Sequence, residues 1–133
     1  MKHSDIIKKH RARLRKLAQV APALSVEVVA DASPVWTGAF MDSINLSPNS
    51  INKSFKVYGD EKVSISVEIQ KLEDAKLRAK KNSKRIKLGN DTYVTDSVHH
   101  NKIVEYKLGY RPFGLAVNAW QNTVNEAVRV VSA

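Results

Sequence analysis

The sequence predicts an α+β domain in which a kinked N-terminal helix and a C-terminal helix pack on one face of a mostly antiparallel sheet of four or five strands. Three observations support this fold class. Apolar residues have helical spacing in the first thirty residues, alternate with polar residues in the middle of the chain, and return to helical spacing after Pro112. With 133 residues, of which 43% are hydrophobic, the chain is most simply a single domain over residues 1–133.

Residues 1–32 are predicted to form a helical N-terminal arm. Ser4 suits the N-cap position, and one apolar stripe contains Ile7, His10, Leu14, Leu17, Ala21, Leu24 and Val28. Pro22 lacks an amide hydrogen and crowds the preceding turn, so it should interrupt or kink this helix. We expect one helix to about Val20 and a second that begins near Pro22, where proline suits a first helical position.

The middle of the chain is predicted to form the sheet. After a short turn or helical piece at residues 35–43, period-two alternation marks strands at 44–47, 55–58 and 63–69. Residues 58–62 suit a hairpin connection, and Gly89-Asn90-Asp91 suits a second hairpin between strands at 85–88 and 92–95.

Two further segments have weaker patterns. Residues 70–84 contain good helix formers but few large apolar residues, so they are predicted to be a basic loop or a short helix. Residues 97–107 suit another short helix. The final helix is predicted from the stripe after Pro112, formed by Phe113, Val117, Trp120, Val124, Ala127 and Val131.

The net charge of +9 is concentrated in two basic blocks. Residues 1–16 contain seven basic residues and one acidic residue, and residues 71–87 contain eight basic and two acidic residues. Such blocks either bind a polyanion or another acidic surface, or act as solvated faces that keep the protein in solution. The chain has no cysteine, no secretory leader is apparent, and its longest apolar stretch is too polar to span a bilayer.

No catalytic or metal-binding pattern is present in the sequence. His99 and His100 are adjacent, so their side chains point in different directions and make a poor pair of ligands. The sequence contains no nucleophile elbow and no phosphate-cradling glycine loop. We therefore predict a protein that is not an enzyme and that uses no cofactor and no metal.

Turn-forming residues surround a tryptophan in the segment Pro34-Val35-Trp36-Thr37-Gly38. Pro34 fixes one backbone angle, Gly38 permits a conformation closed to other residues, and Thr37 can bond back onto the turn. Trp36 is interpreted in two ways: as a core residue at a helix-to-strand corner, or as a contact between neighbouring subunits.

A second motif runs from Glu105-Tyr106 to Arg111-Pro112-Phe113. Glu105 lies among apolar residues, and a partly buried carboxylate needs a partner. Arg111 is the candidate through a bidentate ion pair, either within the chain or across a subunit boundary.

The order of these motifs resembles the tail-completion and head–tail joining (neck) proteins of long-tailed bacteriophages. The shared pattern is a basic helix, P-V-x-T-G, a Ser-Ile strand start, V-E-aromatic, R-P-F and a closing helix, which covers nearly the whole chain. The resemblance implies a structural virion protein made in the host cytoplasm. It would assemble as a ring around the DNA channel at the head–tail junction, in contact with other neck, tail or connector proteins and with no membrane.

The resemblance also gives the basic blocks a purpose, because a ring repeats each block by symmetry. The residues expected to face packaged DNA or an acidic partner are Lys76, Arg78, Lys80, Lys81, Lys84, Arg85 and Lys87. The alternative function is a free nucleic-acid-binding protein that uses both basic blocks. Ring size, the contacted neighbours and the oligomeric state of the isolated protein remain open at this point.

Overall fold

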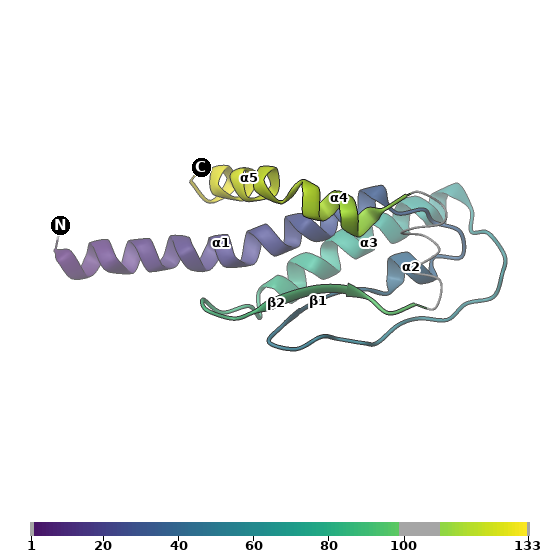
Figure 1. Cartoon of the computed structure of the whole chain (residues 1–133), viewed down its shortest axis with the longest axis horizontal. Helices are drawn as coiled ribbons and strands as arrows, with labels where there is room; N and C mark the ends of the chain where they lie inside the picture. Colours follow the sequence, from purple (N-terminus) through teal and green to yellow (C-terminus); the bar gives the residue numbers. More distant parts are fainter. Residues whose placement is uncertain (1, 99–109, 133) are drawn as a thin grey trace.

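Helices make up most of the chain. The computed structural model describes residues 2–98 and 110–132, which contain α1 (His3–Ala32), α2 (Ala39–Asp42), β1 (Ile44–Pro48), α3 (Ile65–Ser83), β2 (Thr92–Asp96), α4 (Pro112–Asn118) and α5 (Trp120–Ser132) (Figure 1). The strands form a two-stranded antiparallel sheet. The predicted sheet of four or five strands is therefore wrong.

The helix α1 runs without interruption through Pro22, so the predicted division into two helices near this residue is wrong. Proline in a helix interior removes one backbone hydrogen bond. The C-terminal half of α1 offsets this cost through burial, because Val26 and Val29 are 2% and 0% exposed in the core. Tertiary packing on this half of α1 has thus overridden the local preference of Pro22.

The predicted strand at 63–69 is wrong, because residues 65–69 are the beginning of α3. Ser64 caps this helix by accepting a hydrogen bond from the amide of Val67, and Glu68 in the first turn complements the helix dipole. The small residues Ala75 and Ala79 are 1% and 3% exposed, in the same core as Val26 and Val29 of α1. Helical structure at 70–84, one of the two alternatives considered for this segment, is confirmed.

Strand formation at 44–47 and 92–95 is confirmed, but the partners differ from those predicted. β2 pairs with β1 in a register that places Ile44 opposite Asp96 and Leu46 opposite Val94. Residues 85–88 are not a strand but follow α3 in a turn, in which Gly89 has a φ of +90°. The predicted hairpin between 85–88 and 92–95 is therefore wrong.

Residues 50–58, here called the return segment, are also not in a strand. They lie along β1 through hydrogen bonds made by side chains on one face of that strand. The Lys56 amide donates to Ser43 Oγ at 2.8 Å, Asn45 Nδ2 donates to the Ser54 carbonyl at 2.8 Å, and Ser47 Oγ donates to the Ser50 carbonyl at 2.7 Å. Side-chain bonds therefore replace the backbone ladder that the alternation at 55–58 had predicted.

A helix after Pro112 is confirmed, with an interruption at Ala119 that separates α4 from α5. Both helices lie along α1, as Figure 1 shows, so the prediction that the C-terminal helix packs on the sheet is wrong. The short helical piece predicted within 35–43 is confirmed as α2. In the part of the chain that the structure describes, no helix has the length and apolar character needed to cross a membrane.

Candidate subunit-interaction surfaces

The two sequence motifs, about seventy residues apart, meet in the core. Phe40, two residues after the first motif, and Phe113 at the end of the second make an edge-to-face contact, with ring centroids 6.5 Å apart and an interplanar angle of 69°. Pro112 is fully buried at the first turn of α4, while Arg111 before it is exposed with a φ of 44°. This part of each motif therefore has a structural role.

Trp36 is 60% exposed, so its interpretation as a core residue is wrong. Its indole Nε1 donates to the Asp60 carbonyl at 3.0 Å, and the ammonium of Lys62 lies 5.5 Å from the ring centroid. The Trp36 carbonyl in turn accepts from the Val63 amide at 2.7 Å. These bonds hold the tryptophan against the segment before α3 while its ring stays accessible to a partner.

The turn at Thr37-Gly38 has the geometry expected from its residues. Gly38 has a φ of 89°, and a side chain there would also collide with the side chain of Lys71. Thr37 Oγ1 accepts from the Ala39 amide at 3.2 Å. Pro34, Trp36, Thr37 and Gly38 line one side of a pocket of about 460 Å³, and Val57 and Tyr58 line another part of it.

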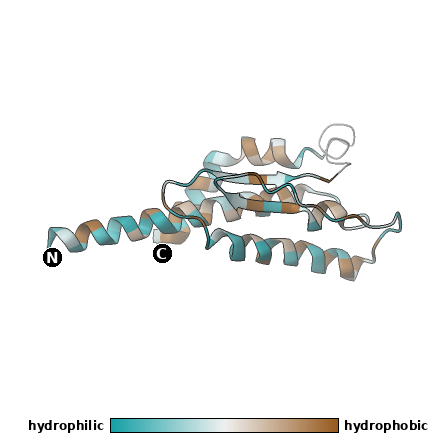
Figure 2. Cartoon of the chain, turned by 90° about the horizontal axis from the view of Figure 1, so that it is seen from below, coloured by the Kyte–Doolittle hydropathy of each residue, from teal (hydrophilic) through white to brown (hydrophobic). Residues whose placement is uncertain are grey.

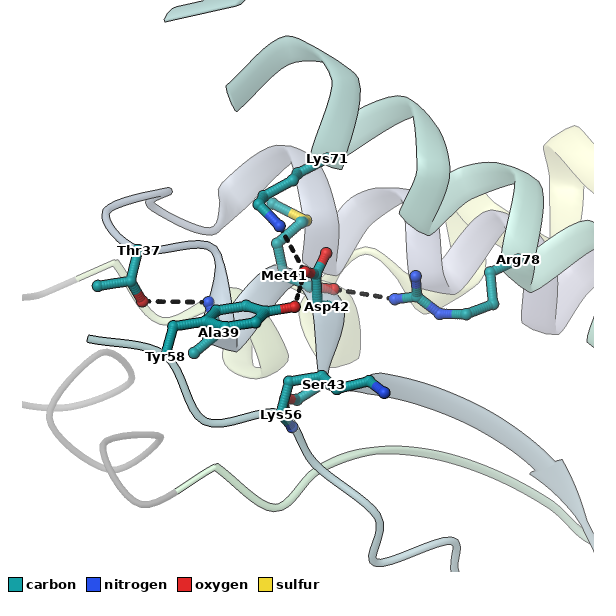
Figure 3. Close-up of polar contacts among 9 residues, drawn as sticks. All are labelled: Thr37, Ala39, Met41, Asp42, Ser43, Lys56, Tyr58, Lys71 and Arg78. Atoms are coloured by element: carbon teal, nitrogen blue, oxygen red, sulfur yellow. Dashed lines mark hydrogen bonds and ion pairs between the residues drawn. The ribbon is translucent and has the colours of Figure 1, made fainter. Parts of the chain in front are cut away.

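Asp42 joins the return segment to α3, as Figure 3 shows. Its carboxylate accepts from Tyr58 Oη at 2.6 Å and pairs with Lys71 Nζ at 2.5 Å, and the ammonium lies 4.9 Å from the Tyr58 ring centroid. The hydrogen bond to Asp42, together with burial, raises the pKa of Tyr58 to about 12. Sequence patterns gave no signal for this cluster, because its members are 16 and 29 residues apart.

The second basic block is divided between internal and external roles. Lys76 pairs with Asp31 at 2.9 Å, and Arg78 donates to the Met41 carbonyl at 2.9 Å (Figure 3) and to the Ile44 carbonyl at 3.3 Å. The other residues expected to face DNA or an acidic partner are exposed near the C-terminal end of α3: Lys80, Lys81, Lys84, Arg85 and Lys87. Gln19 Nε2 donates to the Ile86 carbonyl at 3.0 Å, which places this exposed group beside α1.

The first basic block is the exposed N-terminal half of α1. Every residue from 2 to 16, here called the basic arm, is exposed, and this part of α1 projects beyond the rest of the molecule (Figure 1). It also presents apolar side chains, with Ile7 and Leu14 55% and 50% exposed. The arm is thus both positively charged and partly apolar.

The opposite end of the molecule has a different surface, here called the acidic tip and formed by Trp36 and residues 60–69. Ile65 and Ile69, one helical turn apart, are 73% and 58% exposed. Figure 2 shows hydrophobic segments at the end of the molecule far from the N-terminus, and Figure 1 places the start of α3 at that end. The acidic residues of the tip are Asp60 and Glu61, which are exposed, and Glu68, which is half-buried.

A buried carboxyl group lies at the end of β2. Asp96 is 7% exposed and Oδ1 accepts from the Val98 amide at 3.0 Å. Burial raises the pKa of Asp96 to about 7, opposed by the bond from Val98 and by the charge of Arg78. His99, His100, Glu105 and Tyr106 lie outside the described residues, so the expected Glu105–Arg111 pair stays a prediction.

No cluster of three or more metal-ligating side chains occurs within residues 2–98 and 110–132. Comparisons of the chain with family models, curated proteins and solved structures give no match.

Proposed function

We propose that this chain is a structural virion protein at the head–tail interface of a long-tailed bacteriophage, where it assembles as a ring around the DNA channel. The observation that supports this proposal is the segregation of surface character. A basic arm with exposed apolar side chains lies at one end of an elongated chain, and an acidic tip with exposed isoleucines lies at the other. Opposite charge beside exposed apolar side chains suits contacts between neighbouring subunits.

The motif residues also support an assembly role. Phe40 and Phe113 join the two motifs in the core, while Trp36 from the first motif stays exposed and fixed by hydrogen bonds. Tryptophan is enriched at the centres of protein interfaces, so a rigidly held and accessible Trp36 suits a subunit contact.

The test is the fate of virions that lack the protein. In the virus that encodes this chain, a nonsense mutation in its gene should leave DNA-filled heads and tails that do not join, and purified protein added to the lysate should restore joined particles. Joined, infectious particles at the normal yield in the mutant, with none of the protein in wild-type particles by mass spectrometry, would contradict the proposal.

The second candidate is a free nucleic-acid-binding protein. Five exposed basic residues at the end of α3 lie beside α1, whose N-terminal half holds the first basic block. This function predicts that the isolated protein binds duplex DNA with an affinity that falls steeply as salt is raised. Binding that survives high salt, or no binding at low salt, would exclude it.

A further inference from the structure

The basic arm is a helix without a packing partner among residues 2–98 and 110–132. Residues 2–16 are exposed throughout, although Ile7 and Leu14 lie two turns apart on one face. A helical segment of this length is marginal in water unless an apolar face is covered. The exposed face of the arm therefore points to a binding partner.

The acidic tip is equally uncovered, but it is held in place. The Val63 amide bonds to the Trp36 carbonyl, and Asp42 anchors Tyr58 and Lys71 on either side of the segment that carries the tip. Ile65, Ile69 and Trp36 are thus exposed apolar side chains on a preorganised support. Preorganisation lowers the entropic cost of binding.

The two surfaces are complementary in charge. Residues 2–16 contain seven basic residues and one acidic residue, whereas residues 60–69 of the acidic tip contain three acidic residues and one basic residue, Lys62. The ammonium of Lys62 lies over the Trp36 ring. In a chain with a net charge of +9, the acidic tip is therefore a locally acidic segment that also carries exposed apolar side chains.

We propose that the basic arm of one copy of this chain docks on the acidic tip of a second copy, with Ile7 and Leu14 against Ile65, Ile69 and Trp36. The two surfaces lie at opposite ends of the molecule, so one chain cannot satisfy both contacts by itself (Figure 1). A contact between two different surfaces is heterologous, and it generates a ring wherever the rotation closes. This inference rests on the proposed ring assembly and names the surfaces that build it.

Charge exchange between the surfaces tests the contact. Reversal of the arm (Lys8→Glu, Arg11→Glu, Arg15→Glu) or of the tip (Asp60→Lys, Glu61→Lys, Glu68→Lys) should each weaken self-association at least tenfold, measured by analytical ultracentrifugation. The variant with all six changes should associate again, as should an equimolar mixture of the two triple variants.

The matched control reverses three charges outside the contact. The variant Lys80→Glu, Lys84→Glu, Lys87→Glu changes net charge as much as the arm reversal does, and these residues are also exposed. It should associate as the wild type does. Equal loss in this control would show that net charge alone governs association and would overturn the proposal.

The absence of native cysteine permits a geometric test of the same contact. The double variant Ile7→Cys, Ile69→Cys, treated with a short bismaleimide, should give a ladder of cross-linked multimers on a denaturing gel. Each single variant should give no cross-linked species. Dimers from a single variant would show that like surfaces meet, and they would overturn the proposal. Circular dichroism checks that all variants keep wild-type helix content.

The outcomes separate this contact from the proposed function. A wild-type chain that stays monomeric up to about 1 mM and gives no ladder overturns the arm–tip contact. The place of the protein in the virion is decided independently by the nonsense mutant and by particle composition. A partner other than a second copy is indicated if the arm reversal abolishes DNA binding but leaves self-association unchanged, and this result also overturns the proposal.

Discussion

The two halves of α1 belong to one continuous helix but differ completely in their surroundings. Residues 2–16 are exposed, whereas Val26, Val29 and Ala30 toward the other end are at most 2% exposed. Apolar residues at helical spacing occur in both halves of α1. Helical periodicity thus predicts the helix but not its buried face, because Leu24 and Val28 of the predicted stripe are only half-buried while Val26 and Val29 outside it are buried. It also does not show whether the cover comes from the same chain.

Residues 36–40, which begin in the first motif and end just after it, show the same contrast. Phe40 is 4% exposed and touches Phe113, while Trp36 is 60% exposed and touches the segment before α3. Both are large aromatic residues beside a turn. Their difference separates residues that stabilise the fold from residues that remain available to a partner.

The largest expected effect comes from truncating Phe40, the buried member of this pair. Phe40→Ala should lower the free energy of unfolding by about 3–5 kcal/mol, because it leaves a cavity beside Phe113. Trp36→Ala should change it by less than about 0.5 kcal/mol, because most of the ring is already in water. Urea denaturation followed by circular dichroism measures both. Equal losses would show that Trp36 supports the fold as Phe40 does.

The same comparison applies within α1 with a smaller effect. Val29→Ala should cost about 2 kcal/mol, because Val29 is 0% exposed in the core. Leu14→Ala removes a larger side chain from the exposed half and should leave stability unchanged in dilute protein, where copies do not associate. If Leu14→Ala destabilised the dilute chain as much as Val29→Ala, the arm would have to pack within its own chain.

The sequence predicted those elements whose local and tertiary preferences agree. The helix after Pro112 and the strands at 44–47 and 92–95 were correctly placed, and so was the helical piece before β1. Their type was correct, but their buried faces were not all predicted. In β1 the polar Asn45 and Ser47 are buried as well as Ile44 and Leu46, and Val117 and Trp120 of the final stripe are 73% and 46% exposed. Periodicity and turn residues therefore predicted the kind of element better than its packing.

The failures arise where local and long-range preferences conflict. The alternation of Val63, Ile65, Val67 and Ile69 is typical of a strand, but the helix formers after residue 70 and the Ser64 cap extend α3 across most of it. The burial of Ala75 and Ala79 was missed because the prediction for residues 70–84 considered only large apolar residues. The cluster around Asp42 could not be predicted, since three separate segments contribute to it.

A third contrast uses the dependence of stability on pH. The carboxyl group of Asp96 is buried in the part of the molecule that packs together, whereas the basic arm is exposed. Its pKa of about 7 lies above the ordinary value of 3.8, so the folded state keeps a proton that the unfolded state releases. The stabilisation is complete below about pH 4 and is lost as pH rises through about 7, with a slope of at most about 1.4 kcal/mol per pH unit. Asp96→Asn should remove this slope in urea titrations between these limits.

An arm variant provides the control for the pH experiment. Leu14→Ala leaves Asp96 and its neighbours untouched, so the dependence of stability on pH should match that of the wild type. A slope that persists in Asp96→Asn would assign the titration to another group and contradict the prediction.

The smallest expected effect concerns Asp42, which connects the acidic tip to the rest of the molecule. Asp42→Ala removes the acceptor shared by Tyr58 and Lys71, and it should lower global stability by only about 1 kcal/mol, because water reaches the partly exposed partners. Its main result should be local. The return segment and residues 59–63, which bond to Trp36, lose an anchor. Trypsin should therefore cleave after Lys56 and Lys62 faster than in the wild type, while cleavage after Arg129 stays unchanged.

The matched control for Asp42→Ala is Glu126→Ala, which removes an exposed carboxylate paired with Arg129 on α5. An exposed pair of this kind contributes little to stability, so cleavage at Lys56 and Lys62 should not change. If Asp42→Ala also leaves cleavage there unchanged, then other contacts, such as the bond from Trp36 to Asp60, suffice to hold the tip. In that case the acidic tip would be held independently of Asp42, and the contacts of Asp42 with Tyr58 and Lys71 would contribute little to its position.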